Sequence, residues 1–128
     1  MKLKDIEVNF SFSDADDLER LENSARKVKE KSSKYEKKEL SVSEAIREEC
    51  KIINDFFDEV FGSGISKRLF NDKNDLKEHI DLFEDIINEK VKQTAAFQNM
   101  YNNIEYNTKY MPNREQRRYN QFHKGNRR

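Results

Sequence analysis

SVSEAIREECKIINDFFDEVFGSGISKRLF, residues 41–70, contains a helix start, a wide apolar stripe and a helix end in direct succession. Ser41, with Glu44 three residues later, forms the capping-box pattern of a helix N-terminus. Phe56 and Phe57 point about 100° apart around a helix, so the stripe is wide enough to contact two neighbouring elements. The pattern predicts the central helix of an α-helical core, with apolar positions at Val42, Ala45, Ile46, Cys50, Ile53, Phe56, Phe57, Val60 and Phe61.

Two glycines, Gly62 and Gly64, follow this stripe. A phosphate-binding loop of the GxxxxGK type needs a strand before it, and a dinucleotide-binding turn needs GxGxxG, whereas GSGISK has neither the strand nor the third glycine. We therefore expect Gly62 to supply the left-handed residue that ends the helix and Gly64 to turn the chain. Ile65, Leu69 and Phe70 then form a short helical turn that covers one end of the core.

A helix is predicted on each side of this central segment. Ser13 is the expected N-cap of the first, with Asp14, Asp16 and Asp17 in its first turn, where the helix dipole favours negative charge. The last helix is expected to start near Asn74 or Asp75. The first helix has its apolar stripe at Leu18, Leu21, Ala25, Val28 and Tyr35, and the last has apolar residues at Leu76, Ile80, Phe83, Ile86, Ile87, Val91, Phe97, Tyr101 and Ile104.

Residues 3–12, LKDIEVNFSF, alternate between apolar and polar side chains. Ile6, Val8, Phe10 and Phe12 share one face, which is typical of a half-buried strand. The sequence contains no convincing second strand. A lone strand leaves backbone groups unpaired, so it must lie on helices with one edge in water or pair with another chain. The pattern therefore predicts self-association, and we expect a homo-oligomer.

The composition limits the size of the core and divides the chain by charge. With 128 residues, 39% of them charged and 34% hydrophobic, the chain fits one domain with a thin core. Residues 109–128 carry seven basic residues and one acidic residue, a net charge of +6, which leaves −6 for residues 1–108 of the neutral chain. The predicted fold is mainly α: a three-helix core with a short N-terminal strand over residues 1–108, and a disordered basic tail over residues 109–128.

Several functional classes lack their sequence signals. No run approaches the roughly 18 apolar residues of a membrane helix, and the stretch MKLKDIEVNF lacks the continuous apolar core of a signal peptide, so we expect an intracellular, soluble protein. Cys50 is the only cysteine, which excludes an internal disulfide and a zinc site built on paired cysteines. His79 and His123 are not accompanied by a convergent set of catalytic groups, and NDKNDLKEH lacks the spacing of a calcium loop. We expect no enzymatic activity, no cofactor and no metal.

Three segments resemble small tail-assembly-chaperone-like proteins of phages and prophages of Gram-positive bacteria. They are DADDLER after the N-terminal strand, IREECKIINDFFDEVFGSGISKRLFNDKNDLKEHIDLFEDII, and the closing KYMPNREQRR. In those proteins the counterpart of FFDEVFGSGISKRLF is usually followed by two glycines, whereas this chain has Asn71 and Asp72. The resemblance covers most of the chain and is most specific around residues 56–70 and 110–118.

The resemblance implies a non-enzymatic role in virion assembly, in the cytoplasm of the host bacterium. Such chaperones are thought to coat the tape measure protein, a long and largely helical chain, and to keep it soluble until tail tube subunits polymerise around it. Helical apolar grooves, repeated in many weak copies, suit such a client. The expected client-binding face of the central helix consists of Ile53, Phe56, Phe57, Val60 and Phe61, with Phe83 and Ile87 opposite. The basic segment, with Tyr110, Arg114, Arg117 and Arg118, is the expected contact for a second partner such as the tube subunit.

Two alternatives remain open from the sequence. One is a small regulatory or nucleic-acid-binding phage protein that acts through the basic C-terminal segment, where Tyr110, Tyr119 and Phe122 lie among arginines. The net charge of −6 on residues 1–108 argues against it, because that part would repel phosphate. The other is a structural tail component that stays in the finished particle.

Overall fold

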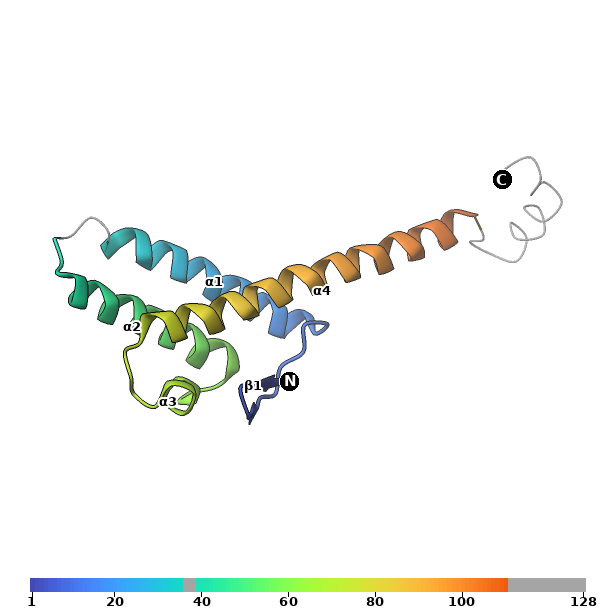
Figure 1. Cartoon of the computed structure of the whole chain (residues 1–128). Helices are drawn as coiled ribbons and strands as arrows, with labels where there is room; N and C mark the ends of the chain where they lie inside the picture. Colours follow the sequence, from blue (N-terminus) through green and yellow to red (C-terminus); the bar gives the residue numbers. More distant parts are fainter. Residues whose placement is uncertain (36–38, 111–128) are drawn as a thin grey trace. The chain divides into compact units, whose positions relative to one another are not determined.

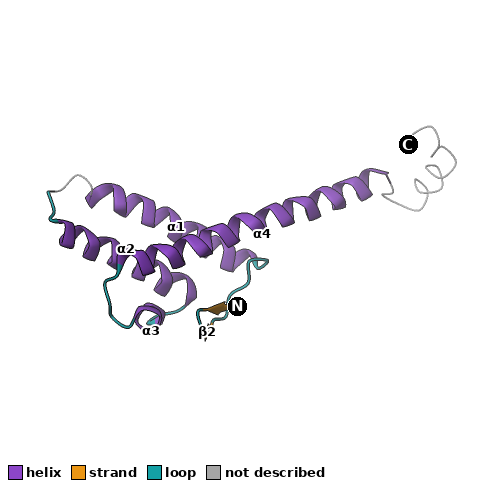
Figure 2. Cartoon of the chain, in the orientation of Figure 1, coloured by secondary structure: helices purple, strands orange, loops and turns teal. Residues whose placement is uncertain are grey.

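The structure is a computed structural model, which describes the backbone of residues 1–35 and 39–110 and the side chains of residues 1–35 and 39–105. Its elements, in chain order, are β1 (Lys2–Leu3), β2 (Ile6–Glu7), α1 (Ala15–Tyr35), α2 (Val42–Phe61), α3 (Ile65–Phe70) and α4 (Leu76–Tyr110), as Figures 1 and 2 show. The chain is mainly helical with a short N-terminal sheet, which confirms the predicted fold class. It divides into two compact units, which we call unit 1 (Met1–Lys90) and unit 2 (Val91–Arg128).

The N-terminal segment is a hairpin, so the prediction of one continuous strand over residues 3–12 was wrong. β1 and β2 pair antiparallel, with Lys2 opposite Glu7 and Leu3 opposite Ile6. Lys4 makes the turn with a positive φ of 55°. The two strands form backbone hydrogen bonds with each other, so β1 does not need a strand from another chain as its partner. The alternation was nevertheless informative, since Leu3, Val8 and Phe10 are buried in the core of unit 1 and Ile6 and Phe12 pack against it.

α1 is capped by Asp14, not by the predicted Ser13. The Asp14 carboxylate accepts a hydrogen bond from the backbone N–H of Asp17 at 2.9 Å, which is the geometry of an N-cap. The hydroxyl of Ser13 lies 2.9 Å from that of Ser11 instead. The backbone N–H of Ser11 and the Arg20 side chain both donate to the Asp17 carboxylate and lower its pKa. The predicted apolar stripe is confirmed, because Leu21 and Val28 are buried and Leu18 and Ala25 pack on the same core.

α2 is the central helix that the sequence predicts. Its capping box is complete: the Ser41 hydroxyl accepts from the Glu44 backbone N–H at 3.2 Å, and the Glu44 carboxylate accepts from the Ser41 backbone N–H at 3.1 Å. The hydrogen bond from the Ser41 backbone lowers the pKa of Glu44. The buried residues of α2 make up much of the core of unit 1, and they are Cys50, Ile52, Ile53, Phe56, Phe57 and Val60.

The two glycines end α2 in a different way from the one expected. Gly62 was predicted to be left-handed, but it has φ 131° and ψ 143°. Gly64 adopts the left-handed conformation instead, with φ 84° and ψ −1°. Asp58 joins α2 to α3, because its carboxylate accepts hydrogen bonds from both the backbone N–H and the hydroxyl of Ser66. The predicted short helical turn is α3, in which Ile65, Leu69 and Phe70 are buried.

Two further left-handed residues connect α3 to α4. Asn71 and Asp72 have φ of 53° and 60°. Glycine adopts this conformation at least cost, and Asn and Asp adopt it more readily than other residues with a side chain. Asp75 then caps α4, since its carboxylate accepts from the backbone N–H of Glu78 at 2.9 Å.

α4 enters both units. Within unit 1 its residues Ile80, Leu82, Phe83 and Ile86 pack on the core. Within unit 2 it extends to Tyr110, so the first two residues of the predicted disordered tail are helical. The rest of that tail lies outside the described residues.

Candidate functional site

Most of the predicted client-binding face belongs to the core of unit 1. Ile53, Phe56, Phe57 and Val60 are each 2% exposed or less. In this conformation their side chains contact other core residues, so a partner would reach them only if the core opened. A role for these four residues in binding stays a prediction. Phe61 differs from them, because its ring is half-buried at the surface of unit 1.

Phe12, Phe61 and Phe83 remain half-buried around this core, and we call them the aromatic rim. Each of the three rings contacts a buried ring. The ring centroid of Phe10 lies 5.0 Å from those of both Phe12 and Phe61, and the ring centroid of Phe56 lies 4.9 Å from that of Phe83. Aromatic rings that are fixed on one side and open on the other are suited to anchor a partner, because little side-chain entropy is lost on binding.

The predicted contacts for a second partner lie at the end of the chain. Tyr110 is the last residue of α4, and Arg114, Arg117 and Arg118 lie outside the described residues. These four assignments stay predictions.

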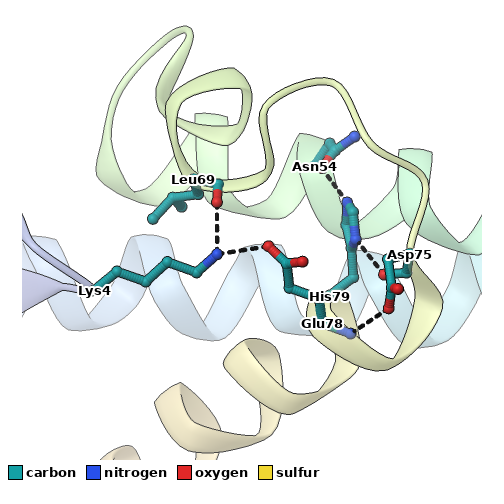
Figure 3. Close-up of polar contacts among 6 residues, drawn as sticks. All are labelled: Lys4, Asn54, Leu69, Asp75, Glu78 and His79. Atoms are coloured by element: carbon teal, nitrogen blue, oxygen red, sulfur yellow. Dashed lines mark hydrogen bonds and ion pairs between the residues drawn. The ribbon is translucent and has the colours of Figure 1, made fainter.

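A buried histidine joins three elements in unit 1, and sequence reasoning did not single out its surroundings. His79 on α4 is 0% exposed, and its ring stacks on Phe70 of α3 at a centroid distance of 3.7 Å. Its Nδ1 lies 2.7 Å from the backbone carbonyl oxygen of Asp75, and its Nε2 lies 2.9 Å from the side-chain amide oxygen of Asn54 on α2 (Figure 3). The histidine therefore joins α2, α3 and α4.

The surroundings of His79 favour the neutral imidazole. Burial lowers the pKa of His79, and this outweighs the opposing effect of its hydrogen bond to the Asp75 carbonyl. Both ring nitrogens face acceptor oxygens, so the neutral ring donates one hydrogen bond, either from Nδ1–H to the Asp75 carbonyl or from Nε2–H to the Asn54 amide oxygen. The second proton of the imidazolium would place a positive charge in the buried space between α2 and α4. We therefore expect the stability of this cluster to depend on pH.

Lys4 attaches the N-terminal hairpin to the same region. Its Nζ donates to the backbone carbonyl of Leu69 and pairs with the Glu78 carboxylate, both at 2.6 Å (Figure 3). The ammonium also lies 5.1 Å from the centre of the Phe70 ring. These contacts tie the hairpin turn to α3 and α4, and they offset the cost of the left-handed backbone at Lys4.

Unit 2 exposes an apolar helix face. Met100, Tyr101 and Ile104 are 59%, 62% and 63% exposed, and Phe97 is half-buried. With spacings of three and four residues, these side chains share one side of α4. Phe97, Tyr101 and Ile104 were predicted to lie in the apolar stripe of a helix, but the exposure of this stripe was not predicted. We call these four residues the distal face.

Among residues 1–35 and 39–105, no group of three or more His, Cys, Asp and Glu side chains is placed to hold a metal ion. No described helix is long and apolar enough to cross a membrane. The thiol of Cys50 is buried, and burial raises its pKa, which makes it a poor nucleophile.

The fold and these surfaces define a mainly helical protein with an aromatic core, a partly open aromatic rim and an exposed helix face. Residues 4–121 match the family of unknown function DUF6673, and because the match spans most of the 128 residues, the chain belongs to that family. No curated protein and no solved structure matches the chain.

Proposed function

We propose that this protein is a phage tail assembly chaperone, which binds the tape measure protein and keeps it soluble until the tail tube polymerises around it. The observation that carries the proposal is the aromatic rim of Phe12, Phe61 and Phe83, whose rings are fixed by buried rings and are still accessible. A long amphipathic helix offers complementary apolar side chains along its length. Many weak contacts of this kind, repeated along the client, give a large total affinity.

Two further observations support this role. The resemblance to tail-assembly-chaperone-like proteins is most specific around residues 56–70, which form the end of α2, the Gly62–Gly64 turn and α3. Asn71 and Asp72 adopt the left-handed conformation at the positions where those proteins usually carry glycines.

Co-expression with the tape measure protein encoded nearby in the same genome tests the proposal. We expect the tape measure to be soluble only when this protein is present, and the two to elute together from a sizing column. Phe61→Ser should reduce the recovered complex. Val42→Ser is the matched control, because Val42 is an exposed apolar residue of the same helix. An insoluble tape measure beside freely eluting wild-type protein would overturn the proposal.

A further inference from the structure

Three of the four residues of the distal face of α4 are exposed in the part of the chain that the structure describes, and the fourth, Phe97, is half-buried. Met100, Tyr101 and Ile104 present most of their side-chain surface to water. Because the four residues of this face lie at i, i+3, i+4 and i+7, they form one continuous stripe along two turns of helix. Such a stripe is typical of a surface that packs on another helix.

The same segment is free of charge. From Gln93 to Ile104 twelve consecutive residues contain no Lys, Arg, Asp or Glu, although 39% of the whole chain is charged. Ion pairs between successive turns therefore cannot stabilise this part of the helix. It also contains Thr94, Asn99, Asn102 and Asn103, which have modest helix propensity. A helix of this composition depends on packing for its stability, and a covering partner would supply that packing.

We propose that the distal face packs against the distal face of a second copy of this chain, with the two α4 helices antiparallel. The charges at the two ends of the neutral segment favour this arrangement. Lys92 precedes the segment and Glu105 follows it. In an antiparallel pair centred between Gln98 and Asn99, Lys92 of each copy is level with Glu105 of the other, whereas a parallel pair in register places like charges together.

The distribution of charge along the chain also favours a second copy as the partner. Residues 1–90 carry a net charge of −6, and residues 109–128 carry +6. The antiparallel arrangement brings Lys109, where the basic segment begins, level with Asn88 near the end of unit 1 of the second copy. Lys109 of one copy thereby comes level with the end of the acidic sequence of the other, which favours association and selects orientation.

The apolar contacts are compatible with this register. Phe97 of one copy is level with Met100 of the other, and by symmetry the contact occurs twice. A flexible methionine packs readily against an aromatic ring. The inference goes beyond the proposed function, because it concerns the protein without its client. A monomeric protein would overturn the pairing and leave the co-expression result unaffected.

Light scattering on the full-length protein, without client, tests the pairing. We expect a mass near twice the chain's 15.4 kDa, falling toward that of one chain as salt is added, because salt screens the charge pairing. Met100→Glu should raise the dissociation constant roughly tenfold or more, because it places a charge in the apolar contact. Val42→Glu, at another exposed apolar site, should leave the mass unchanged. A monomer in low salt, or a Met100→Glu dimer as stable as the wild type, would overturn the proposal.

Spin labels on single introduced cysteines determine the orientation. The native Cys50 is 0% exposed and is not expected to react with the label. In the antiparallel pair, labels at Asn99→Cys are level with each other along the helix axis, on the outer sides of the two helices, whereas labels at Lys92→Cys are displaced along that axis by about 20 Å. Equal distances for the two labelled variants would establish a parallel pair and contradict the proposal.

Discussion

His79 stacks on Phe70, with ring centroids 3.7 Å apart and planes inclined by 15°, while both of its ring nitrogens contact polar groups of other residues. This contact joins α3 to α4 inside unit 1. It places an ionisable group among side chains that favour its neutral form, and the stability of unit 1 should depend on pH as a result.

The free energy of unfolding should fall when the pH is lowered through the usual pKa of histidine, about 6.5. Burial lowers the pKa of His79 in the folded chain, so the unfolded chain binds the proton first. Stability contributed by the neutral ring is therefore complete above that pH and is lost progressively below it. Urea unfolding at a series of pH values measures the effect. His79→Leu should remove this dependence, and His123→Gln should retain it. A wild-type stability that is constant across this range would contradict the assignment.

Removing the His79 ring should destabilise unit 1. His79→Ala leaves a cavity against Phe70 and takes away the partner of the Asn54 amide. We expect a loss of about 2–4 kcal/mol in the free energy of unfolding. Lys77→Ala, on the exposed side of the same helix turn, should leave the stability nearly unchanged, because its ion pair with Asp81 is exposed to solvent. Equal losses for the two variants would show that the buried cluster has no special role.

Lys4→Met should loosen the hairpin. The substitution keeps the left-handed backbone but removes the hydrogen bond to the Leu69 carbonyl and the ion pair with Glu78. The expected loss is about 1–2 kcal/mol. Glu78→Gln, which removes only the partly exposed ion pair, should cost less than about 1 kcal/mol. Chemical denaturation of the three proteins compares them, and a larger loss for Glu78→Gln would be inconsistent with the role given to the Leu69 carbonyl.

Asp72→Gly should preserve or increase stability, whereas Asp72→Ala should reduce it by about 1 kcal/mol. Asp72 has φ 60°, a conformation that glycine adopts without strain. Its ion pair with Lys67 is long at 3.8 Å and exposed, so losing it costs little. Thermal melting ranks the variants. If alanine is tolerated as well as glycine, the left-handed backbone is not what determines the residue at this position.

Asp14→Ala should weaken the start of α1, with a cost of about 1 kcal/mol. Ser13→Ala should cost clearly less, because its hydroxyl does not bond the first helical turn. The comparison distinguishes the cap in the structure from the one that the sequence predicts. The reverse order of stability would restore Ser13 as the cap.

The features that were predicted correctly from the sequence are local. The capping box of Ser41 and Glu44 spans three residues, and the alternation of Val8 and Phe10 follows from the geometry of extended chain. The hairpin was missed because Lys4 is not a turn-forming residue. Its conformation is stabilised by contacts with Leu69 and Glu78, which are 65 and 74 residues away. No short window of sequence contains that information.

In the candidate sites, too, local patterns were predicted from the sequence, whereas contacts between distant residues were not. Most of the apolar stripe on α2 was predicted correctly, although Val42 is 78% exposed and the buried Ile52 was not included. The pattern does not distinguish the side of a helix that faces the core from the side that faces a partner. The structure buries Ile53 and Phe57 and leaves Phe61 half-buried. The His79 cluster depends on Asn54, Phe70 and Asp75 meeting in space, which a spacing rule does not reveal.

The most direct test of the chaperone role is the solubility of the tape measure protein when it is co-expressed with wild-type protein, with Phe61→Ser or with Val42→Ser, followed by purification in low and high salt. The proposal predicts a soluble complex with the wild type and with Val42→Ser that survives high salt, and a marked loss with Phe61→Ser. A tape measure that stays insoluble in all three cases, while this protein elutes with nucleic acid that salt removes, would contradict it and favour the nucleic-acid-binding alternative.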